Sequence, residues 1–377
     1  MIAFAAEDSN NHSPKPTPLY AALAAASEAN AWCIINGYAV VKAIASAHED
    51  YATATQEAAL VDLGSMARYS ISGPDAALAI GRLTTLQCKR IAIGESDAGL
   101  MLNDVGGVID LCDVSRLSDD MFILVTPMAH GRWISLGMRG FDVHVADISD
   151  DVGAIGLIGP NAEAAFTKTI GRKLSQAPGV SKIVRGVETA FRKIRIGDVG
   201  GYELVFPKDE ALTIWERFVR RAGAVAIGLE AMELLRIEAG LPRTGVDFEC
   251  ANRAGHAYRY PSALGLAHLA PLDRKGFNGR SNLRDADISD HRLVTLAIDA
   301  DGIAAGAQVR SGSTVLGHIT SSAWSPSQKR VIAFSELDGK ALGRAKELEV
   351  VAADGASFDA RHFSTNESRR ERKFYAR

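Results

Sequence analysis

The feature that most constrains the fold is a local pattern that occurs three times: a short apolar strand, a turn containing proline, and a helix. It is found at residues 69–83 (YSISGPDAALAIGRL), at 152–171 (VGAIGLIGPNAEAAFTKTIG) and at 201–223 (GYELVFPKDEALTIWERFVRRAG). Proline lacks a backbone N–H and has a fixed φ, so it ends a strand and suits the first turn of a helix. The repetition predicts related α+β units in which helices cover sheets.

Two stretches between and after these units predict strands without helices. Residues 99–126 hold a Gly-Gly turn within NDVGG and a polar turn RLSDD, each between apolar runs, which predicts two adjacent hairpins. From about residue 290 short strands alternate with turns, which predicts a small all-β barrel or sandwich. The alanine-rich residues 18–60 predict two helices.

The composition excludes several classes of protein. The 377 residues are 47% hydrophobic and 23% charged with a net charge of −3, which indicates a globular chain of two or three domains. This balance gives no sequence-wide attraction to nucleic acid or to an anionic membrane, and it leaves a homo-oligomer open. The four scattered cysteines form no CxxC pair and the first residues resemble no signal peptide, so we expect no metal site and a cytoplasmic location.

Six segments, in order along nearly the whole chain, resemble the glycine-cleavage T-protein (aminomethyltransferase) superfamily, which includes folate-dependent demethylases. No single segment is specific, and their common order carries the resemblance. They are TPLY (17–20), VDLGSMARYSISGPDA (61–76), MLNDVGGVID (101–110), GYELVFP (201–207), GLEAMELLRIEAG (228–240), and the pair GFNGR (276–280) and GHITSSAWSP (317–326).

The resemblance implies an α+β fold with three domains arranged as a cloverleaf around a central cavity. The first α+β domain would combine residues 1–60 with 130–225, and the second would combine residues 61–129 with 226–285. Residues 286–377 would form a C-terminal antiparallel β-barrel domain. Relatives bind tetrahydrofolate in the opening and pass a one-carbon unit to it.

The resemblance also assigns roles to individual residues. Asp110 matches the first of two adjacent acids in the family's hairpin, where a carboxylate acts near the reacting one-carbon unit; the alternative is an acid that only solvates the turn. Glu203 matches the acid that grips the amino-pyrimidine edge of the pterin, since a carboxylate accepts two parallel N–H bonds. Asn103, at the start of the hairpin turn, is a further polar binding candidate. Tyr202 lies next to Glu203 and is also a candidate, with packing as the commoner role for such a tyrosine.

Three positions depart from the folate-using pattern. Leu111 stands where relatives have the second acid, Pro127 where they have asparagine, and Met232 where they have arginine. These exchanges remove donors and charge, so the pocket becomes more apolar and suits an aromatic ligand better than a glutamyl-pterin. The resemblance implies tetrahydrofolate as the cofactor, although several of the positions that would contact it are replaced in this sequence.

Two further segments supply candidates near the implied cavity. His130 follows the hairpin unit and Tyr258 lies in the loop GHAYRYP; both could serve as acid or base beside Asp110. The same loop carries basic and aromatic groups that could hold a phenol or a carboxylate, although packing on the barrel is an equally simple role. These binding candidates are His256, Arg259 and Tyr260.

Three functional hypotheses follow. The first is a tetrahydrofolate-dependent methyltransferase or demethylase acting on a small substrate, with methoxylated aromatics among the options. The second is a cofactor-independent lyase on the same fold that releases formaldehyde from a hydroxymethyl-bearing aromatic substrate. The third is a non-catalytic folate-binding or scaffold protein that has kept only the fold.

Overall fold

The computed structural model of the chain describes residues 13–171, 180–184, 187–252, 258–284 and 291–363. Within these ranges, every helix is too short or too polar to cross a lipid bilayer.

The described residues form two compact units, and each unit is continuous in space but not in sequence. One unit comprises residues 100–111 and the described residues from 233 onward. The other comprises the described residues from 13 to 99 and from 112 to 232. The chain therefore passes between the units within strands β6 (Ser96–Leu102) and β7 (Val108–Arg116) and within helix α7 (Leu229–Glu238).

The discontinuous unit that ends at residue 232 contains a six-stranded sheet with the order β11-β12-β13-β10-β4-β14. The central strands pair antiparallel, and Gly156 of β10 lies between Val61 of β4 and Glu203 of β13. The strands are β4 (Ala59–Asp62), β10 (Val152–Ile158), β11 (Val180–Val184), β12 (Val187–Ile196), β13 (Val199–Pro207) and β14 (Val225–Ala226).

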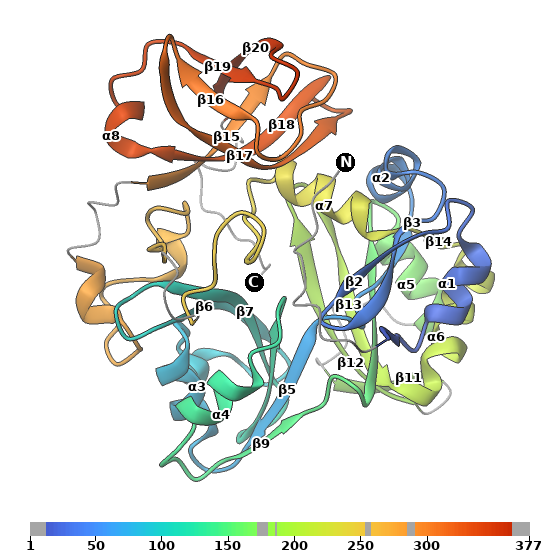
Figure 1. Cartoon of the computed structure of the whole chain (residues 1–377). Coiled ribbons are helices and arrows are strands. Elements are labelled where there is room, and N and C mark those ends of the chain that lie inside the picture. Colours follow the sequence, from blue (N-terminus) through green and yellow to red (C-terminus); the bar gives the residue numbers. More distant parts are fainter. Residues whose placement is uncertain (1–12, 172–179, 185–186, 253–257, 285–290, 364–377) are drawn as a thin grey trace. The chain divides into compact units, whose positions relative to one another are not determined.

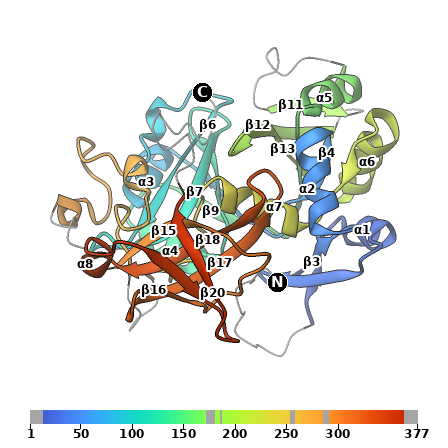
Figure 2. The same cartoon turned by 90° about the horizontal axis from the view of Figure 1, so that it is seen from above.

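One face of this sheet is covered by helices, and both views place α5 and α6 on the same side of β12 and β13 (Figure 1, Figure 2). Phe166 and Ile214 of these helices pack on Leu204 of β13 in one apolar core. Because side chains alternate along a strand, Glu203 projects to the opposite face. The covering helices are α1 (Tyr20–Ala26), α5 (Ala162–Ile170) and α6 (Ala211–Arg217), which the π-helical turn η4 (Phe218–Ala222) extends.

The N-terminal segment differs from the expectation of two helices over residues 18–60. The ends are helical, as α1 and α2 (Ala47–Gln56), but β2 (Ala31–Ile35) and β3 (Tyr38–Ala43) form an antiparallel hairpin between them. Asn36 takes the turn at φ 50°, and Trp32 and Val41 place their β-forming side chains on paired positions. The short strand β1 (Lys15–Pro16) completes this three-stranded sheet.

A five-stranded sheet has the order β6-β7-β8-β5-β9. Its two predicted hairpins are confirmed: NDVGG joins β6 to β7, and RLSDD joins β7 to β8. The strands are β5 (Ala67–Ser72), β6 (Ser96–Leu102), β7 (Val108–Arg116), β8 (Met121–Thr126) and β9 (His144–Asp147), and the helices beside them are α3 (Ala76–Leu83), η1 (Cys88–Arg90) and α4 (Gly131–Gly137).

The C-terminal part forms the predicted β-structure as a closed barrel in the order β15-β18-β17-β16-β19-β20. It is drawn in orange and red in Figure 1. Leu296, Ile319 and Val331 are fully or almost fully buried in its core. The strands are β15 (His291–Ile298), β16 (Gln308–Ser311), β17 (Thr314–Ser325), β18 (Arg330–Asp338), β19 (Leu348–Val351) and β20 (Ser357–His362), with α8 (Gly339–Leu342) after β18.

Helix α7 (Leu229–Glu238) precedes, in sequence, the segment that carries the candidates Tyr258, Arg259 and Tyr260. The helix ends at a glycine cap, because Gly240 adopts φ 69° and its N–H bonds the carbonyl of Ile237. The following chain is mostly irregular and contains only the short helices η5 (Ala267–Leu269) and η6 (Arg280–Arg284) among its described residues.

Candidate functional site

Asp110 is a completely buried carboxylate on β7. Its Oδ1 accepts a hydrogen bond of 2.6 Å from the hydroxyl of Thr244 and one of 2.9 Å from the N–H of Leu111. Thr244 is 1% exposed and lies in the segment after α7. Asp110 is therefore not a solvent-exposed acid of the turn. Its carboxylate is oriented by the hydroxyl group of Thr244, which lies far away in the sequence.

The turn before Asp110 is held by Asn103, a residue that the resemblance made a binding candidate. Its Oδ1 accepts from the N–H of Gly107 at 2.7 Å, and its Nδ2 donates to the carbonyl of Ala251 at 3.1 Å. Both ends of the amide thus bond to the protein backbone. In this structure Asn103 closes the β6–β7 turn and ties it to residue 251.

Two tyrosines pack directly on the glycines of this turn. A methyl group at Gly107 would lie 2.8 Å from Cβ of Tyr258, and one at Gly106 would lie 3.3 Å from the ring of Tyr260. The two rings meet edge to face with their centroids 5.7 Å apart. Burial raises the pKa of Tyr260, and the hydrogen bond with Tyr258 acts in the same direction. The glycine pair therefore permits the turn and also makes room for the aromatic pair.

Arg259 lies between these tyrosines and points toward the barrel. Its Nε donates to Oε1 of Glu336 at 2.6 Å, and its carbonyl accepts from the N–H of Val108. The described part of the loop GHAYRYP is thus fixed to the start of β7 and to β18. His256, the other candidate from this loop, lies outside the described residues.

Glu203 lies in a buried chain of four charges. Its Oε1 accepts from Nη2 of Arg68 at 2.6 Å, and its Oε2 accepts a very short hydrogen bond from Nε of Arg192. Nη1 of Arg192 is 3.0 Å from Oδ1 of Asp113 on β7. The glutamate is 1% exposed, so two arginines replace water around its carboxylate. The chain of charges connects β13 and β12 of the six-stranded sheet with β5 and β7 of the five-stranded sheet.

The electrostatics of Glu203 follow from these partners. Burial alone would raise the pKa of this carboxyl, but the charges of Arg192 and Arg68 and their hydrogen bonds bring the pKa down to about 2. Both carboxylate oxygens are engaged by the protein. The residues around Glu203 therefore do not fit the grip on an amino-pyrimidine edge that the resemblance assigns to this glutamate.

A second buried carboxylate lies near the same arginine. Asp62 accepts from the hydroxyl of Thr17 at 2.5 Å and from the N–H of Gly64 at 2.8 Å. Burial raises the pKa of Asp62, while these hydrogen bonds and the charge of Arg68 oppose the increase. The TPLY segment of the resemblance thus has a structural role, because its threonine satisfies a buried acid at the end of β4.

The remaining candidates have diverse surroundings. Tyr202 faces the helix-covered side of its sheet, opposite to Glu203, and its hydroxyl bonds Glu163. Pro127 accepts from Nδ2 of Asn36 at 2.8 Å, and the N–H of His130 donates to the hydroxyl of Tyr69 at 2.8 Å. Leu111 packs against the apolar cluster around Leu102 and Phe248, and Met232 is 8% exposed. The described candidates divide between the two compact units. The unit with residues 100–111 contains Asn103, Asp110, Leu111, Tyr258, Arg259 and Tyr260. The other unit contains Pro127, His130, Tyr202, Glu203 and Met232.

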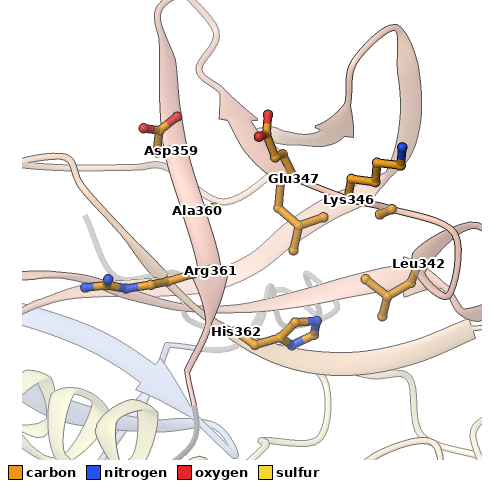
Figure 3. Close-up of a pocket in the computed structure, with 9 residues that line it drawn as sticks. Leu342, Lys346, Glu347, Asp359, Ala360, Arg361 and His362 are labelled. Carbon is orange, nitrogen blue, oxygen red and sulfur yellow. The ribbon is translucent and has the colours of Figure 1, made fainter.

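The barrel carries a surface hollow of about 510 Å³ between the α8–β19 connection and β20. Figure 3 shows the carboxylates of Asp359 and Glu347 at its upper edge and the guanidinium of Arg361 extending to another side. Leu342 and His362 lie at its lower edge. The charged groups point apart, and the residues that line the hollow include none of the described site candidates. Among the described residues, no cluster of His, Cys, Asp or Glu could hold a metal ion.

Sequence reasoning missed the residues that surround the two acids. Thr244 contacts Asp110 across 134 positions, and Arg68 contacts Glu203 across 135. Arg68 and Asp113 did leave a signal, since each is a charged residue within a strand whose neighbours are apolar. A charge at such a position predicts a buried partner, but the sequence does not say which one.

Comparison with known proteins places this geometry in a family. Residues 19–255 match the family described as the GCVT N-terminal domain, and residues 291–365 match the glycine cleavage T-protein C-terminal barrel domain. The aminomethyltransferase of Herpetosiphon aurantiacus is 30% identical over 315 residues, which is 79% of this chain and 84% of the relative. The aminomethyltransferase of Thermotoga petrophila is 26% identical over 326 residues, covering 84% and 87%.

The fold is shared with a solved member of the same group. The crystal structure of glycine cleavage system aminomethyltransferase T from Bartonella henselae superposes with a TM-score of 0.81 at 19% identity, covering 94% of this chain and 98% of that one. This likeness confirms the predicted α+β fold with its C-terminal barrel. With both domain families matched in order and most of the chain covered, this protein belongs to the glycine-cleavage T-protein (aminomethyltransferase) family.

Proposed function

We propose that this protein is a one-carbon transferase that acts on a small molecule, with tetrahydrofolate as the partner in the transfer and Asp110 as the carboxylate at the reacting centre. Membership of the aminomethyltransferase family supports folate-dependent one-carbon transfer. The observation that carries the role of Asp110 is its enclosure: the carboxylate is buried and fixed by the hydroxyl of Thr244.

An enclosed carboxylate suits the chemistry of one-carbon transfer. A carbon atom that leaves nitrogen, sulfur or oxygen develops positive charge, which a fixed carboxylate stabilises more strongly in a dry environment than in water. The same carboxylate can accept or deliver a proton when its geometry is right. Both actions use Asp110 of this chain and need no contact from Glu203.

We propose a small aromatic molecule carrying a methoxy group as the substrate class. Leu111, next to Asp110 on β7, supports an apolar environment, since it stands where the folate-using pattern has a second acid. The exposed Tyr258, 40% accessible and packed on the turn before Asp110, adds an aromatic surface in the same unit as the acid. Aromatic rings stack on such surfaces.

Asp110→Asn tests the proposal, because asparagine keeps the shape and the acceptor for Thr244 but removes the negative charge. We expect tetrahydrofolate-dependent turnover of a panel of methyl and aminomethyl donors to fall by about two orders of magnitude, as when a catalytic acid or base is lost. The melting temperature should stay within a few degrees of the wild-type value. Product formation is followed as 5-methyl- or 5,10-methylene-tetrahydrofolate.

Asp104→Asn is the matched control, because this acid lies in the same turn with an exposed side chain. Its turnover should equal that of the wild type. Normal turnover in Asp110→Asn together with a large drop in melting temperature would show that the carboxylate is structural, and the proposed role would be wrong.

A second candidate is favoured by the engagement of Glu203 with two arginines. An enzyme without a pterin grip could release the one-carbon unit as formaldehyde from a hydroxymethyl-bearing aromatic substrate. Formaldehyde release from such substrates without added tetrahydrofolate, combined with no heat of folate binding in a calorimetric titration, would replace the first proposal by this one. Folate binding without turnover of any donor would instead indicate a non-catalytic folate-binding protein.

We also propose a reducing, cytoplasmic setting. All four cysteines lie among the described residues and are present as thiols rather than disulfides. Light scattering of the purified chain would distinguish a monomer from a homo-oligomer.

A further inference from the structure

Thr244 reaches Asp110 from a segment that is unusually well anchored. Residues 241–248 contain no helix or strand, yet several backbone bonds fold them into a tight turn. Gly245 N–H bonds the carbonyl of Phe248 at 2.8 Å, and Leu241 N–H bonds the carbonyl of Arg236 at 2.9 Å. Thr244 also forms an isolated parallel bridge with Phe248.

A buried cluster of four charges fixes this turn. Oδ2 of Asp247 accepts from Nη1 of Arg236 at 2.7 Å and from the N–H of Arg243 at 2.9 Å. Glu233 accepts from Nε of Arg236 at 2.8 Å and from Nη1 of Arg243 at 2.6 Å. Two arginines and two acids thus neutralise each other on both sides of Thr244. We define these four residues, Arg236, Glu233, Arg243 and Asp247, as the anchor cluster.

The barrel strand β17 completes the anchor cluster. Thr320 donates to Oδ1 of Asp247 at 2.9 Å, and Ser321 donates to the same oxygen. Burial alone would lower the pKa of Arg236, but the negative charges of Glu233 and Asp247 raise it, so the arginine stays a cation. Both carboxylate oxygens of Asp247 accept hydrogen bonds from fixed donors. These bonds restrict the conformations of the turn more strongly than those of an ordinary surface loop.

We propose that Thr244 is a positioning residue for Asp110: its hydroxyl sets the orientation of the carboxylate, and the anchor cluster sets the position of that hydroxyl. This inference rests on the proposed function, in which Asp110 acts at the reacting carbon. Its physical basis is that Oδ1 of Asp110 accepts two hydrogen bonds, one from its own strand and one from Thr244. A carboxylate held by two fixed donors keeps one rotamer, and catalysis depends on such small geometric tolerances.

The test compares Thr244→Val with Thr244→Ser. Valine keeps the shape of threonine and removes the donor, whereas serine keeps the donor. We expect kcat to fall about 10- to 100-fold in Thr244→Val with KM within about twofold of the wild-type value, because misplacement of a reacting group acts on the chemical step. Thr244→Ser should retain kcat within about threefold.

Thr314→Val is the matched control, since Thr314 is an exposed threonine at the start of β17 and lies outside the anchor cluster and its partners. Its kcat should stay near the wild-type value. If kcat of Thr244→Val is unchanged, or if Thr244→Ser and Thr314→Val lose as much as Thr244→Val, the positioning role is wrong. Should Thr244→Val fail to fold, Thr244→Ala removes the same hydroxyl without adding a methyl group and replaces it in the comparison.

A crystallographic readout separates this inference from the proposed function. If the wild-type protein turns over none of the donors, the proposed function fails, and the structures of the Thr244 variants still decide the positioning role. A carboxylate of Asp110 that rotates in Thr244→Val and keeps its place in Thr244→Ser supports the inference. An unmoved carboxylate in Thr244→Val overturns it.

Discussion

Glu203 shows how one side chain can keep its identity and change its partners. The resemblance assigns this residue to a ligand, whereas the structure gives both of its oxygens to Arg68 and Arg192. Bringing a carboxylate into a protein interior costs several kcal/mol, and cations with good geometry offset that cost. The two arginines therefore offset the desolvation cost of burying the glutamate, and the glutamate offsets part of the cost of burying the arginines.

Replacing Glu203 should affect stability more than ligand binding. We expect Glu203→Gln to lower the free energy of unfolding by about 3 kcal/mol, because two guanidinium groups would remain buried with only one nearby acid. Urea denaturation measures this change. Glu216→Gln is the control, since its ion pair with Arg220 is exposed and contributes ~0–1 kcal/mol. A stable Glu203→Gln variant that binds tetrahydrofolate much more weakly than the wild type would show that the glutamate serves the ligand after all.

At the scale of elements, the β6–β7 hairpin is the clearest case of local sequence specifying both a turn and a packing surface. Gly106 adopts φ 91°, which L-residues with side chains rarely adopt. Gly107 leaves the room that Tyr258 occupies. One glycine is thus required by its own backbone and the other by a segment about 150 positions away, as Asn103 also bonds residue 251.

Gly107→Ala should disturb the contact rather than the turn itself. The new methyl group would lie 2.8 Å from Cβ of Tyr258, so the segment after residue 257 has to shift. We expect a loss of about 1–3 kcal/mol of stability, typical of overpacking, measured by chemical denaturation. Gly302→Ala is the control, because nothing lies within 4 Å of the position of its new methyl group. Equal stability of the two variants would contradict the packing argument.

The sequence predicted those elements whose signals are local. The NDVGG turn, the RLSDD turn and the strands of the barrel all follow from residues within a few positions of each other. The β2–β3 hairpin was missed because alanine on both sides favours helix, whereas Trp32 and Val41 pair across a turn at Asn36. Propensity is a weak prior that tertiary pairing overrides.

The site was less predictable because its partners come from distant segments. Asp110 and Glu203 were identified through the order of motifs. Their surroundings depend on Thr244 and Arg192, which lie outside the six segments, and on Arg68, which lies in one of them without any sign of its partner. A single sequence reveals that a charge lies in an apolar strand. It does not reveal which distant residue neutralises that charge, since this is decided only when the sheets are packed.

For the whole molecule, the buried Glu203 makes the free energy of unfolding depend on pH between about 2 and 4.5. The glutamate at 203 titrates near its ordinary pKa of 4.5 in the unfolded chain and near 2 in the folded one. A depressed folded pKa gives stability that is fully present above pH 4.5 and is lost as the pH falls toward 2. We expect urea midpoints of the wild type to decrease across this window and those of Glu203→Gln to decrease less. Parallel curves for the two proteins would refute this assignment.

The four-charge chain of Arg68, Glu203, Arg192 and Asp113 has a consequence for the history of the chain. Removing one member leaves another charge buried without its partner, so a single substitution at any of these positions should destabilise the fold. Changes at these positions should therefore occur in pairs, an arginine together with an acid, or in a background with stability to spare. A change that freed Glu203 for a ligand would leave Arg68 or Arg192 buried without its acid, so ligand preference at this position should change only together with one of these arginines.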